Sequence, residues 1–247
     1  LKLIVSGTHL SPHFGFTADE IISSGIELDE KSEVVMSSDS RIGVAKSIGL
    51  GFISYSEILE RVSPDIVIGL GDRFELFAFV SSAFVLGIPI AHIHGGELTE
   101  GAYDDGFRHA ITKMSNLHFT STETYRQRVI QLGEQPDLVF NVGAIGLDNI
   151  RSMELLDIKS LSKELHIDLT DNYMVVTYHP ETNSNESPKE SMMRLLTALD
   201  SFPEFQIIFT MANADHGGSE INSLITDYAK TKANRVHVFS SLGSLRY

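Results

Sequence analysis

The chain has 247 residues, 42 % hydrophobic and 21 % charged, a balance typical of a globular protein rather than a disordered or fibrous one. Its formal net charge of −14 argues against nucleic acids and anionic membranes as partners, because both carry negative phosphates. Cysteine is absent, which excludes disulfides and a thiolate nucleophile. No apolar run approaches the roughly 18–20 residues of a membrane span, and no signal-peptide pattern opens the chain, so we predict a cytoplasmic protein.

Short apolar segments alternate with helical segments along the chain. Most of the apolar segments are continuous rather than alternating, which is typical of strands covered by helices on both faces. This order predicts an α/β fold with parallel sheets and right-handed crossovers. The predicted strands are 3–6, 66–70, 89–93, 117–120, 139–142, 174–178, 207–210 and 236–239, and the predicted helices are 41–61, 73–86, 105–116, 122–132, 187–201 and 218–231.

A stretch with helical propensity at 151–172 separates two sets of strand–helix units. We therefore expect an N-terminal Rossmann-like domain at 1–150, a helical connection at 151–172 and a C-terminal Rossmann-like domain at 173–247, both doubly wound. The chain opens inside a strand and stops soon after the strand at 236–239. We accordingly expect the first strand–helix unit of the N-terminal domain to be missing and the C-terminal domain to be incomplete.

Polar residues whose side chains could bind a ligand or transfer a proton follow the predicted strands. In open α/β sheets, ligands bind beyond the carboxyl ends of the strands. Loops from the two domains are expected to face one another across a cleft, so these residues are candidates for a single site. They are His9, Asp72, Arg73, His94, Glu97, Asp104, Asp105, Arg108, Asp148, His179, Glu181 and Asn213.

Several of these residues have structural alternatives. Asp72 stands between a strand and a helix, where an N-cap is an ordinary role. Asp104 and Asp105 open a helix, where carboxylates offset the macrodipole and cap free N–H groups. Arg108 follows about one turn later, where a salt bridge to those aspartates explains it equally well. The pair Gly95–Gly96 fits a tight turn, because glycine tolerates positive φ, but together with two histidines and Glu97 it favours a close approach of the backbone to a ligand.

Histidines raise the question of a proton carrier or a metal site. His179 precedes a proline at a strand end, which favours a functional role because histidine titrates near neutrality. His92 and His94 are two residues apart, so a strand would place both on one face and permit a metal site without requiring it. No dinucleotide fingerprint, Walker loop or Gly-x-Ser-x-Gly elbow is present. We predict no cofactor and no metal.

Taken together, these motifs resemble the hydrolysing UDP-N-acetylglucosamine 2-epimerases, especially the bacterial enzymes of sialic acid and capsule synthesis. The resemblance covers essentially the whole chain, and its motifs are jointly specific although each is weak alone. They are Gly-Asp-Arg at 71–73, His-Ile-His-Gly-Gly-Glu at 92–97, Asp-Asp-x-x-Arg-His-Ala-Ile-Thr-Lys-Met-Ser at 104–115, Thr-Glu-x-Tyr at 122–125, Arg-Val-Ile-Gln-Leu-Gly-Glu at 128–134, His-Pro-Glu-Thr at 179–182 and Asn-Ala-Asp at 213–215.

The resemblance implies a two-domain fold like that of the GT-B glycosyltransferases, with the substrate in the cleft between domains. Members of the family eliminate UDP across C1 and C2 to give a glycal and then add water to produce the 2-epimer. It therefore implies a UDP-sugar and UDP as ligands, and a homodimer or homotetramer as the assembly. It also implies an arginine-bearing loop before Leu1 and a serine- and glycine-rich UDP loop after Tyr247.

Roles carry over to the residues that match the family motifs. Asp72 and Asp104 correspond to catalytic carboxylates, with Asp105 a near neighbour, and His179 corresponds to a histidine near the pyrophosphate. Binding roles are implied for Arg73 and Asn213 on the nucleotide and for His9 and Asp148 in the sugar pocket, and we add Arg108 and Glu181 as candidate substrate contacts.

One position departs from many relatives, which have glutamate where this chain has His94, whereas capsule-type members have histidine. If that position exchanges a proton, a neutral imidazole must do so here, or Glu97 has taken the role.

For the substrate we expect UDP-N-acetylglucosamine, giving N-acetylmannosamine, with UDP-N,N′-diacetylbacillosamine as the alternative. Three other functions compete with an epimerase. A glycosyltransferase of the same fold would need an acceptor, and a carboxylate cluster at residues 72–105 would be hard to justify in it. A metal-dependent hydrolase would use His92 and His94. A nucleotide-sugar-binding regulator would bind the same ligand without turnover.

Overall fold

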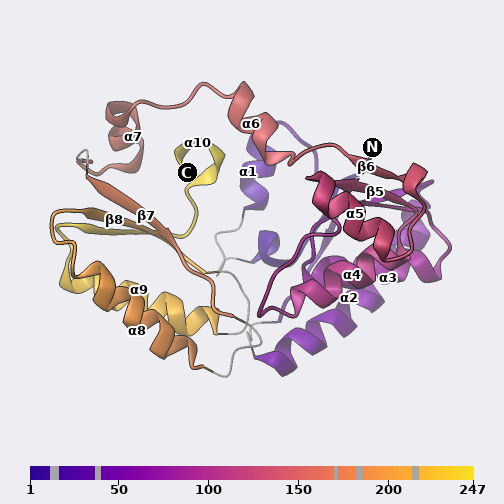
Figure 1. The fold of residues 1–247 in the computed structure, drawn as a ribbon, viewed down its shortest axis with the longest axis horizontal. Coiled ribbons are helices and arrows are strands. Elements are labelled where there is room, and N and C mark those ends of the chain that lie inside the picture. The colour runs from indigo at the N-terminus through magenta and orange to yellow at the C-terminus, as the bar shows by residue number, and fades with distance from the viewer. Residues whose placement is uncertain (12–16, 37–39, 170–171, 182–185, 213–216) are drawn as a thin grey trace. The chain divides into compact units, whose positions relative to one another are not determined.

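The computed structural model describes residues 1–11, 17–36, 40–169, 172–181, 186–212 and 217–247. They form two compact units (Figure 1). Unit 1 comprises Leu1–Gly7, Leu28–Met36 and Ile42–Ser152, and unit 2 comprises Thr8–Glu27, Ser37–Arg41 and Met153–Tyr247. The division into domains at 1–150 and 173–247 with a connection between them stays a prediction.

Unit 1 contains two parallel sheets. One has two strands, β1–β2, and the other has four in the order β3-β4-β5-β6. Crossover helices join the strands of the larger sheet, as the connection of parallel strands requires. The elements in chain order are β1 (Ile4–Ser6), β2 (Glu30–Ser32), α2 (Arg41–Val62), β3 (Val67–Leu70), α3 (Phe74–Val85), β4 (Ile90–Ile93), α4 (Asp104–Met114), β5 (Leu117–Thr120), α5 (Glu123–Gln131), η3 (Pro136–Leu138), β6 (Val139–Asn141) and α6 (Gly146–Ser152).

The core of unit 1 lies between the larger sheet and helices α2, α3 and α4. Leu59, Val80 and Ile111 from the three helices pack with Val67 and Ile90 from the strands, and all five side chains are buried. Burial of apolar surface of this kind is the main favourable contribution to folding. One face of the sheet is therefore fixed against helices, and the strands beneath hold a defined register.

Helix α2 is long and apolar enough, by length and composition, to cross a membrane, which the sequence-based prediction did not anticipate. Its buried residues recur at helical spacing, from Val44 through Gly51 and Tyr55 to Leu59. Gly51 lies so close to α3 that a Cβ there would stand 2.8 Å from the Ala78 methyl carbon. Packing inside unit 1 thus accounts for one apolar face of this helix, while Ile42, Leu50 and Ile53 are exposed.

The carboxyl ends of three neighbouring strands meet at one edge of the larger sheet. Leu70 pairs with Ile93, and Ile93 pairs with Phe119, so β3, β4 and β5 end side by side. The ladder continues one step beyond the strands, because the N–H of Gly71 donates to Ile93 and the N–H of His94 donates to Phe119. The loops that follow these strands consequently start as neighbours.

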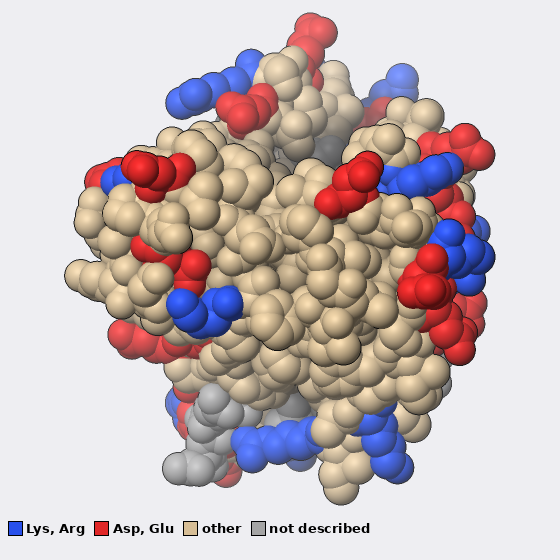
Figure 2. All heavy atoms as spheres, turned by 90° about the vertical axis from the view of Figure 1, so that its right-hand side faces the viewer, with Lys and Arg blue, Asp and Glu red and all other residues tan. Residues whose placement is uncertain are grey.

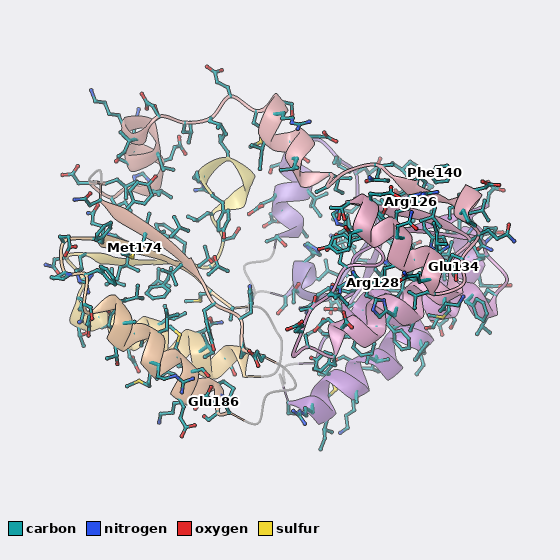
Figure 3. All side chains as sticks on the ribbon, in the orientation of Figure 1. Arg126, Arg128, Glu134, Phe140, Met174 and Glu186 are labelled. Carbon is teal, nitrogen blue, oxygen red and sulfur yellow. The ribbon has the colours of Figure 1, made fainter. Side chains whose placement is uncertain are left out.

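Unit 2 contains a three-stranded parallel sheet, β7-β8-β9, with helices on both faces. Helices α8 and α9 bury Met192, Ile221 and Phe209 on one face, where Met174 of β7 also packs (Figures 1 and 3). On the other face, α7 packs through Leu165 onto Ile208. Its elements are η1 (Gly7–Leu10, which begins at the last residue of unit 1), α1 (Ala18–Ser23), α7 (Ile158–Leu165), β7 (Tyr173–Thr177), α8 (Pro188–Leu199), β8 (Gln206–Thr210), α9 (Gly218–Thr231), β9 (Val236–Phe239) and α10 (Gly243–Arg246).

The predicted parallel α/β architecture is confirmed, and each predicted strand and helix is present with ends within two residues of those expected. The prediction missed β2, a three-residue strand with the sequence Glu-Lys-Ser that carries no apolar signal. It also missed the short helices α1, α6 and α10.

Figure 2 shows one face of the molecule, on which charged side chains lie mainly around the margin of a broad uncharged area. The net charge of −14 is therefore not spread evenly over the surface. Among the exposed apolar residues of unit 1 are Ile68 and Leu70 on β3, and Phe84 and Val85 at the end of α3.

Candidate active site

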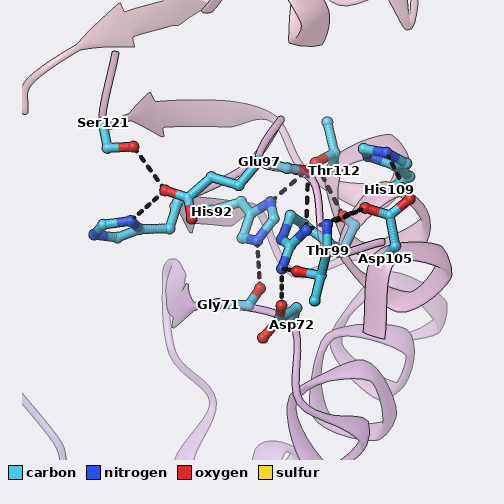
Figure 4. A network of polar contacts seen from close by, with 11 residues as sticks. Gly71, Asp72, His92, Glu97, Thr99, Asp105, His109, Thr112 and Ser121 are labelled. Carbon is cyan, nitrogen blue, oxygen red and sulfur yellow. Dashed lines mark hydrogen bonds and ion pairs between the residues drawn. The ribbon is translucent and has the colours of Figure 1, made fainter. Parts of the chain in front are cut away.

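A network of polar side chains lies at the carboxyl edge of β3, β4 and β5 in unit 1 (Figure 4). Its members come from the loop after each strand and from the first turns of α4. The network contains most of the unit 1 residues predicted from the sequence as site residues, as expected for residues that follow neighbouring parallel strands, and their role in binding a ligand stays a prediction.

Arg108 is the centre of this network. Its side chain is 5 % exposed, and its guanidinium pairs with the carboxylates of both Asp72 and Asp105, at 3.2 Å for the latter. The same group donates to the Thr99 hydroxyl at 2.7 Å and to the backbone carbonyl of Glu97 at 2.9 Å. Arginine suits this position because its planar group offers five donors in a fixed arrangement.

Arg108 therefore forms salt bridges, as one of the two sequence-based interpretations predicted. One buried cation joins the loop after β3, the loop after β4 and helix α4. Direct contact of this residue with a substrate stays a prediction.

Asp72 is not explained by helix capping. The N-cap of α3 is Arg73, one residue later, and it makes no side-chain capping bond. The Asp72 carboxylate instead accepts from Arg108 and keeps 24 % of its surface exposed. A carboxylate held by a buried cation and still open to solvent is well placed to act on a ligand.

The two aspartates at the start of α4 have different surroundings. Asp105 accepts from the backbone N–H of Thr99 at 3.0 Å and from Arg108 at 3.2 Å, and His109 lies 3.5 Å from its other oxygen. Its carboxylate is thus used to hold the loop and helix together. Asp104 is the first residue of α4, beside the N-cap Tyr103, and it is half-buried.

His94 and Glu97 form a hydrogen-bonded pair. The His94 Nδ1 lies 2.7 Å from Glu97 Oε1, and the Ser121 hydroxyl donates to the same oxygen at 2.6 Å. Burial acts to raise the pKa of Glu97, but the hydrogen bonds from Ser121 and His94 and the charges of His94 and Arg108 lower it below its ordinary value. Glu97 is therefore a carboxylate at neutral pH.

His92 is a buried structural residue. Its Nε2 donates to the backbone carbonyl of Gly71 at 2.8 Å, and its Nδ1 lies 3.1 Å from the Thr112 hydroxyl. Burial lowers the pKa of His92 to about 4, so the imidazole is neutral at pH 7. Because a carbonyl only accepts, the proton of the neutral ring lies on Nε2.

The expectation that His92 and His94 share one face of a strand does not hold. Strand β4 ends at Ile93, and His94 adopts a left-handed backbone with φ of +67° that breaks the alternation. Within the described residues, no group of three His, Asp or Glu side chains is arranged to hold a metal ion.

Helix α5 holds the loop that carries His94 and Glu97. A side chain at Gly96, where φ is +80°, would collide with the backbone oxygen of Tyr125, so glycine is required for this close approach. The Arg128 guanidinium donates to the Gly96 carbonyl, and Figure 3 shows Arg128 on α5. The tight turn expected at Gly95–Gly96 is thus a packing requirement.

The remaining predicted residues lie elsewhere. In unit 1, the Arg73 side chain is 29 % exposed and lies 3.4 Å from Glu75, and Asp148 is exposed on α6. In unit 2, His9 lies in η1, where its Nδ1 is 2.7 Å from the Thr17 hydroxyl, and His179 and Glu181 are exposed after β7. Asn213 lies outside the described residues, and the roles of all these residues stay predictions.

Sequence reasoning missed Thr99, Ser121 and the buried Glu75. Ser121 directly follows β5, so the rule used for the other strands applied to it as well. Thr99 carries no such signal, because its contact with Arg108 depends on the path of a loop.

The comparisons with known proteins address the family and the fold of the chain. Residues 1–247 match the family model described as UDP-N-acetylglucosamine 2-epimerase. The chain belongs to this family. The resemblance identified from the motifs is therefore confirmed.

The sequence is similar to those of three relatives of this chain. It is 39 % identical, over all of its residues and 64 % of the relative, to the GDP/UDP-N,N′-diacetylbacillosamine 2-epimerase (hydrolyzing) of Campylobacter jejuni. It is 36 % identical, over 93 % of its length and 59 % of the relative, to polysialic acid biosynthesis protein P7 of Escherichia coli. It is 33 % identical, over 92 % of its length and 60 % of the relative, to the UDP-N,N′-diacetylbacillosamine 2-epimerase (hydrolyzing) of Legionella pneumophila. The chain thus spans 59–64 % of the length of these relatives.

The fold matches solved structures of the family. The UDP-GlcNAc 2-epimerase of Methanocaldococcus jannaschii, in complex with UDP-GlcNAc and UDP, superposes with a TM-score of 0.73 at 16 % identity. The match covers 100 % of this chain and 75 % of that one. This likeness confirms the predicted class of Rossmann-like, GT-B-like α/β folds.

Replacing Arg108 by methionine is expected to destabilise the chain by about 3 kcal/mol. Removing one partner of a buried pair leaves charges without compensation, and the value lies at the low end because Asp72 and Asp105 keep a quarter to a third of their surface exposed. The measurement is the urea midpoint followed by circular dichroism. The matched control is Lys230→Met, which removes an exposed ion pair with Asp227 and is expected to change little. Equal midpoints for the two variants would contradict the central role of Arg108.

His92 is expected to make stability fall as the pH is lowered from about 6.5 to about 4. The native imidazole resists protonation, with its pKa lowered to about 4, whereas the unfolded chain takes up a proton near the ordinary value of 6.5. The unfolded state therefore binds more protons in this window, which costs about 3 kcal/mol over the range. Urea midpoints measured across this window should fall less steeply for His92→Asn than for the wild type. The control His166→Asn changes an exposed histidine in a left-handed position that asparagine tolerates, and it should keep the wild-type slope.

Proposed function

We propose that the protein is a hydrolysing 2-epimerase of a nucleotide-linked N-acetyl-hexosamine. The observation that carries this proposal is the cluster of Asp72, His94 and Glu97 at one sheet edge, with Asp104 in the neighbouring helix turn, in a chain that matches this family over its whole length. Proton carriers grouped at the carboxyl ends of strands fit a reaction that starts by removing a hydrogen from carbon.

The chemistry explains why several proton carriers are needed. The hydrogen on C2 is weakly acidic, so a base must lie close to it and be tuned by its surroundings. As the base takes this proton, the C2–H electrons form the C1=C2 bond and the C1–O bond breaks, releasing the nucleoside diphosphate. Water then adds its oxygen to C1, and C2 receives a proton on the opposite ring face.

The leaving diphosphate develops negative charge and requires cationic or N–H donors. Arg73 is proposed for this role in unit 1, and His179 and Asn213 in unit 2. His9 and Asp148 are proposed for the sugar pocket, and Glu181 as a neighbour of His179. In this proposal Arg108 acts mainly by holding Asp72 and Asp105 in place.

Within this reaction class, we place N,N′-diacetylbacillosamine linked to UDP or GDP first among substrates. Two relatives with identities of 39 % and 33 % carry that substrate in their names. UDP-N-acetylglucosamine, the first expectation from the motifs, is the second candidate, favoured by the family description and by the polysialic acid protein of Escherichia coli. A cytoplasmic homodimer or homotetramer without a metal cofactor completes the proposal.

The test is to incubate the full-length protein in heavy water with each candidate nucleotide sugar side by side. We expect release of the nucleoside diphosphate from one donor, and deuterium at C2 of the free sugar, because the C2 hydrogen exchanges through the base. Asp72→Asn should lower turnover about 10²–10³-fold, the loss typical when one polar group that stabilises the transition state is removed from a reaction centre. Mass spectrometry and proton NMR measure both outcomes.

Three results would count against this proposal. Retention of the original C2 hydrogen would reject the elimination, and absence of diphosphate release from every donor would reject the reaction class. A requirement for an added divalent ion, revealed by loss of activity in chelator, would favour metal-dependent hydrolysis instead.

A further inference from the structure

We infer that His94 is the base that takes the C2 proton, acting through Nε2, and that Glu97 and Ser121 are positioning residues that fix its tautomer. The inference rests on the proposed function and assigns the residues that remove the C2 proton in that reaction. It also resolves the choice between His94 and Glu97 that the sequence left open.

The first step in the argument is the position of the imidazole proton. The Glu97 oxygen that faces His94 Nδ1 at 2.7 Å belongs to a carboxylate, which only accepts hydrogen bonds. The proton of a neutral His94 therefore lies on Nδ1, and its lone pair lies on Nε2. Among the described residues, no hydrogen bond engages Nε2, and the side chain is 21 % exposed. The basic nitrogen is thus accessible.

The second step is the support behind Glu97. Ser121 donates to the same carboxylate oxygen at 2.6 Å, so two donors from different loops fix that oxygen. The backbone carbonyl of Glu97 is held separately by Arg108 at 2.9 Å. Main chain and side chain are therefore both anchored, and the carboxylate cannot rotate away from the imidazole without losing these bonds. This is the arrangement by which a carboxylate orients a histidine base in acyl-transfer enzymes.

The third step is the backbone of His94. A φ of +67° is uncommon for a residue other than glycine and is a strained backbone conformation. The ladder bond from its N–H to Phe119 at 2.8 Å holds this conformation, and Gly96 seals the loop against α5. A glycine at position 94 would relax the strain, so the contacts around the loop are what hold the histidine in this conformation.

The charges around the pair favour a proton acceptor. Glu97 supplies the negative charge directly beside His94, and the charge of Arg108 from α4, which also acts on Glu97, is partly offset by its ion pairs with Asp72 and Asp105. His92 of β4, the remaining titratable neighbour, is neutral at pH 7 because burial lowers its pKa to about 4. When Nε2 takes a proton, the imidazolium is stabilised by the ionised Glu97.

The reaction also needs an acid that gives C2 its new proton. The proton taken by Nε2 passes to water, and a carboxylic acid on the opposite ring face gives C2 its new proton. We assign this acid to Asp104, which is reprotonated by the water whose oxygen bonds to C1. His94 lies in the loop after β4, whereas Asp104 is the first residue of α4.

The experiment compares pH profiles of kcat/KM for diphosphate release by the full-length protein. The acidic limb of this profile reports the essential base of the free enzyme, which the inference assigns to His94. Glu97→Gln removes the charge that stabilises the imidazolium, so the limb should move to lower pH by about one unit or more and kcat should fall about 10²–10⁴-fold. Ser121→Ala should leave Glu97 more basic, moving the limb slightly to higher pH with a loss of about three- to tenfold.

Opposite shifts of the limb distinguish positioning from a merely structural role, which would lower activity without moving the profile. The matched control is Ser81→Ala, since that hydroxyl, on α3, donates to the Phe77 carbonyl at 2.7 Å and should leave the profile unchanged. If both site variants release diphosphate with the wild-type profile, the inference is overturned while the proposed function stands.

A second measurement tests the inference without turnover. Nitrogen-15 NMR of the imidazole rings should show His94 as the Nδ1–H tautomer in the wild type and a changed tautomer population in Glu97→Gln. An Nε2–H tautomer in the wild type would overturn the inference even if no donor is turned over.

Discussion

The buried guanidinium of Arg108 is the interaction on which the candidate site depends. It is 5 % exposed, and it joins Asp72 after β3, the Glu97 carbonyl after β4, and Asp105 within α4. Three loops or turns that carry potential proton carriers are thus tied to a single cation. Because the guanidinium is planar and offers several donors in a fixed arrangement, it holds the two carboxylates beside it in a defined geometry. The price of this arrangement is that Arg108 itself is largely withdrawn from solvent.

A second constraint on the site is the packing of β5 and α5 against the loop that carries His94 and Glu97. Ser121 reaches Glu97 from the end of β5, Arg128 reaches the Gly96 carbonyl from α5, and Gly96 allows the two backbones to approach. The loop with the left-handed histidine is therefore braced on one side by α5 and on the other by the sheet. A strained residue persists only where its surroundings determine it in this way.

The comparisons and the geometry answer different questions. The family match covers the whole chain and the fold matches solved epimerases, so architecture and family are established. The chain spans 59–64 % of the curated relatives, and the units are two separate compact bodies, so substrate and mechanism rest on the chemistry of unit 1 and on the names of relatives.

The sequence by itself determined the alternation of strands and helices, because continuous apolar runs and helical periodicity are local signals, and it located the polar residues at strand ends. Only the tertiary structure decided which of these residues act together. Whether Asp72 caps a helix or pairs with Arg108, and whether His92 shares a face with His94, depends on contacts between segments up to 36 residues apart and on a left-handed turn after Ile93. Spacing along a chain carries no information about such turns, so Ser121 and Thr99 became visible as partners only once the loops were folded against one another.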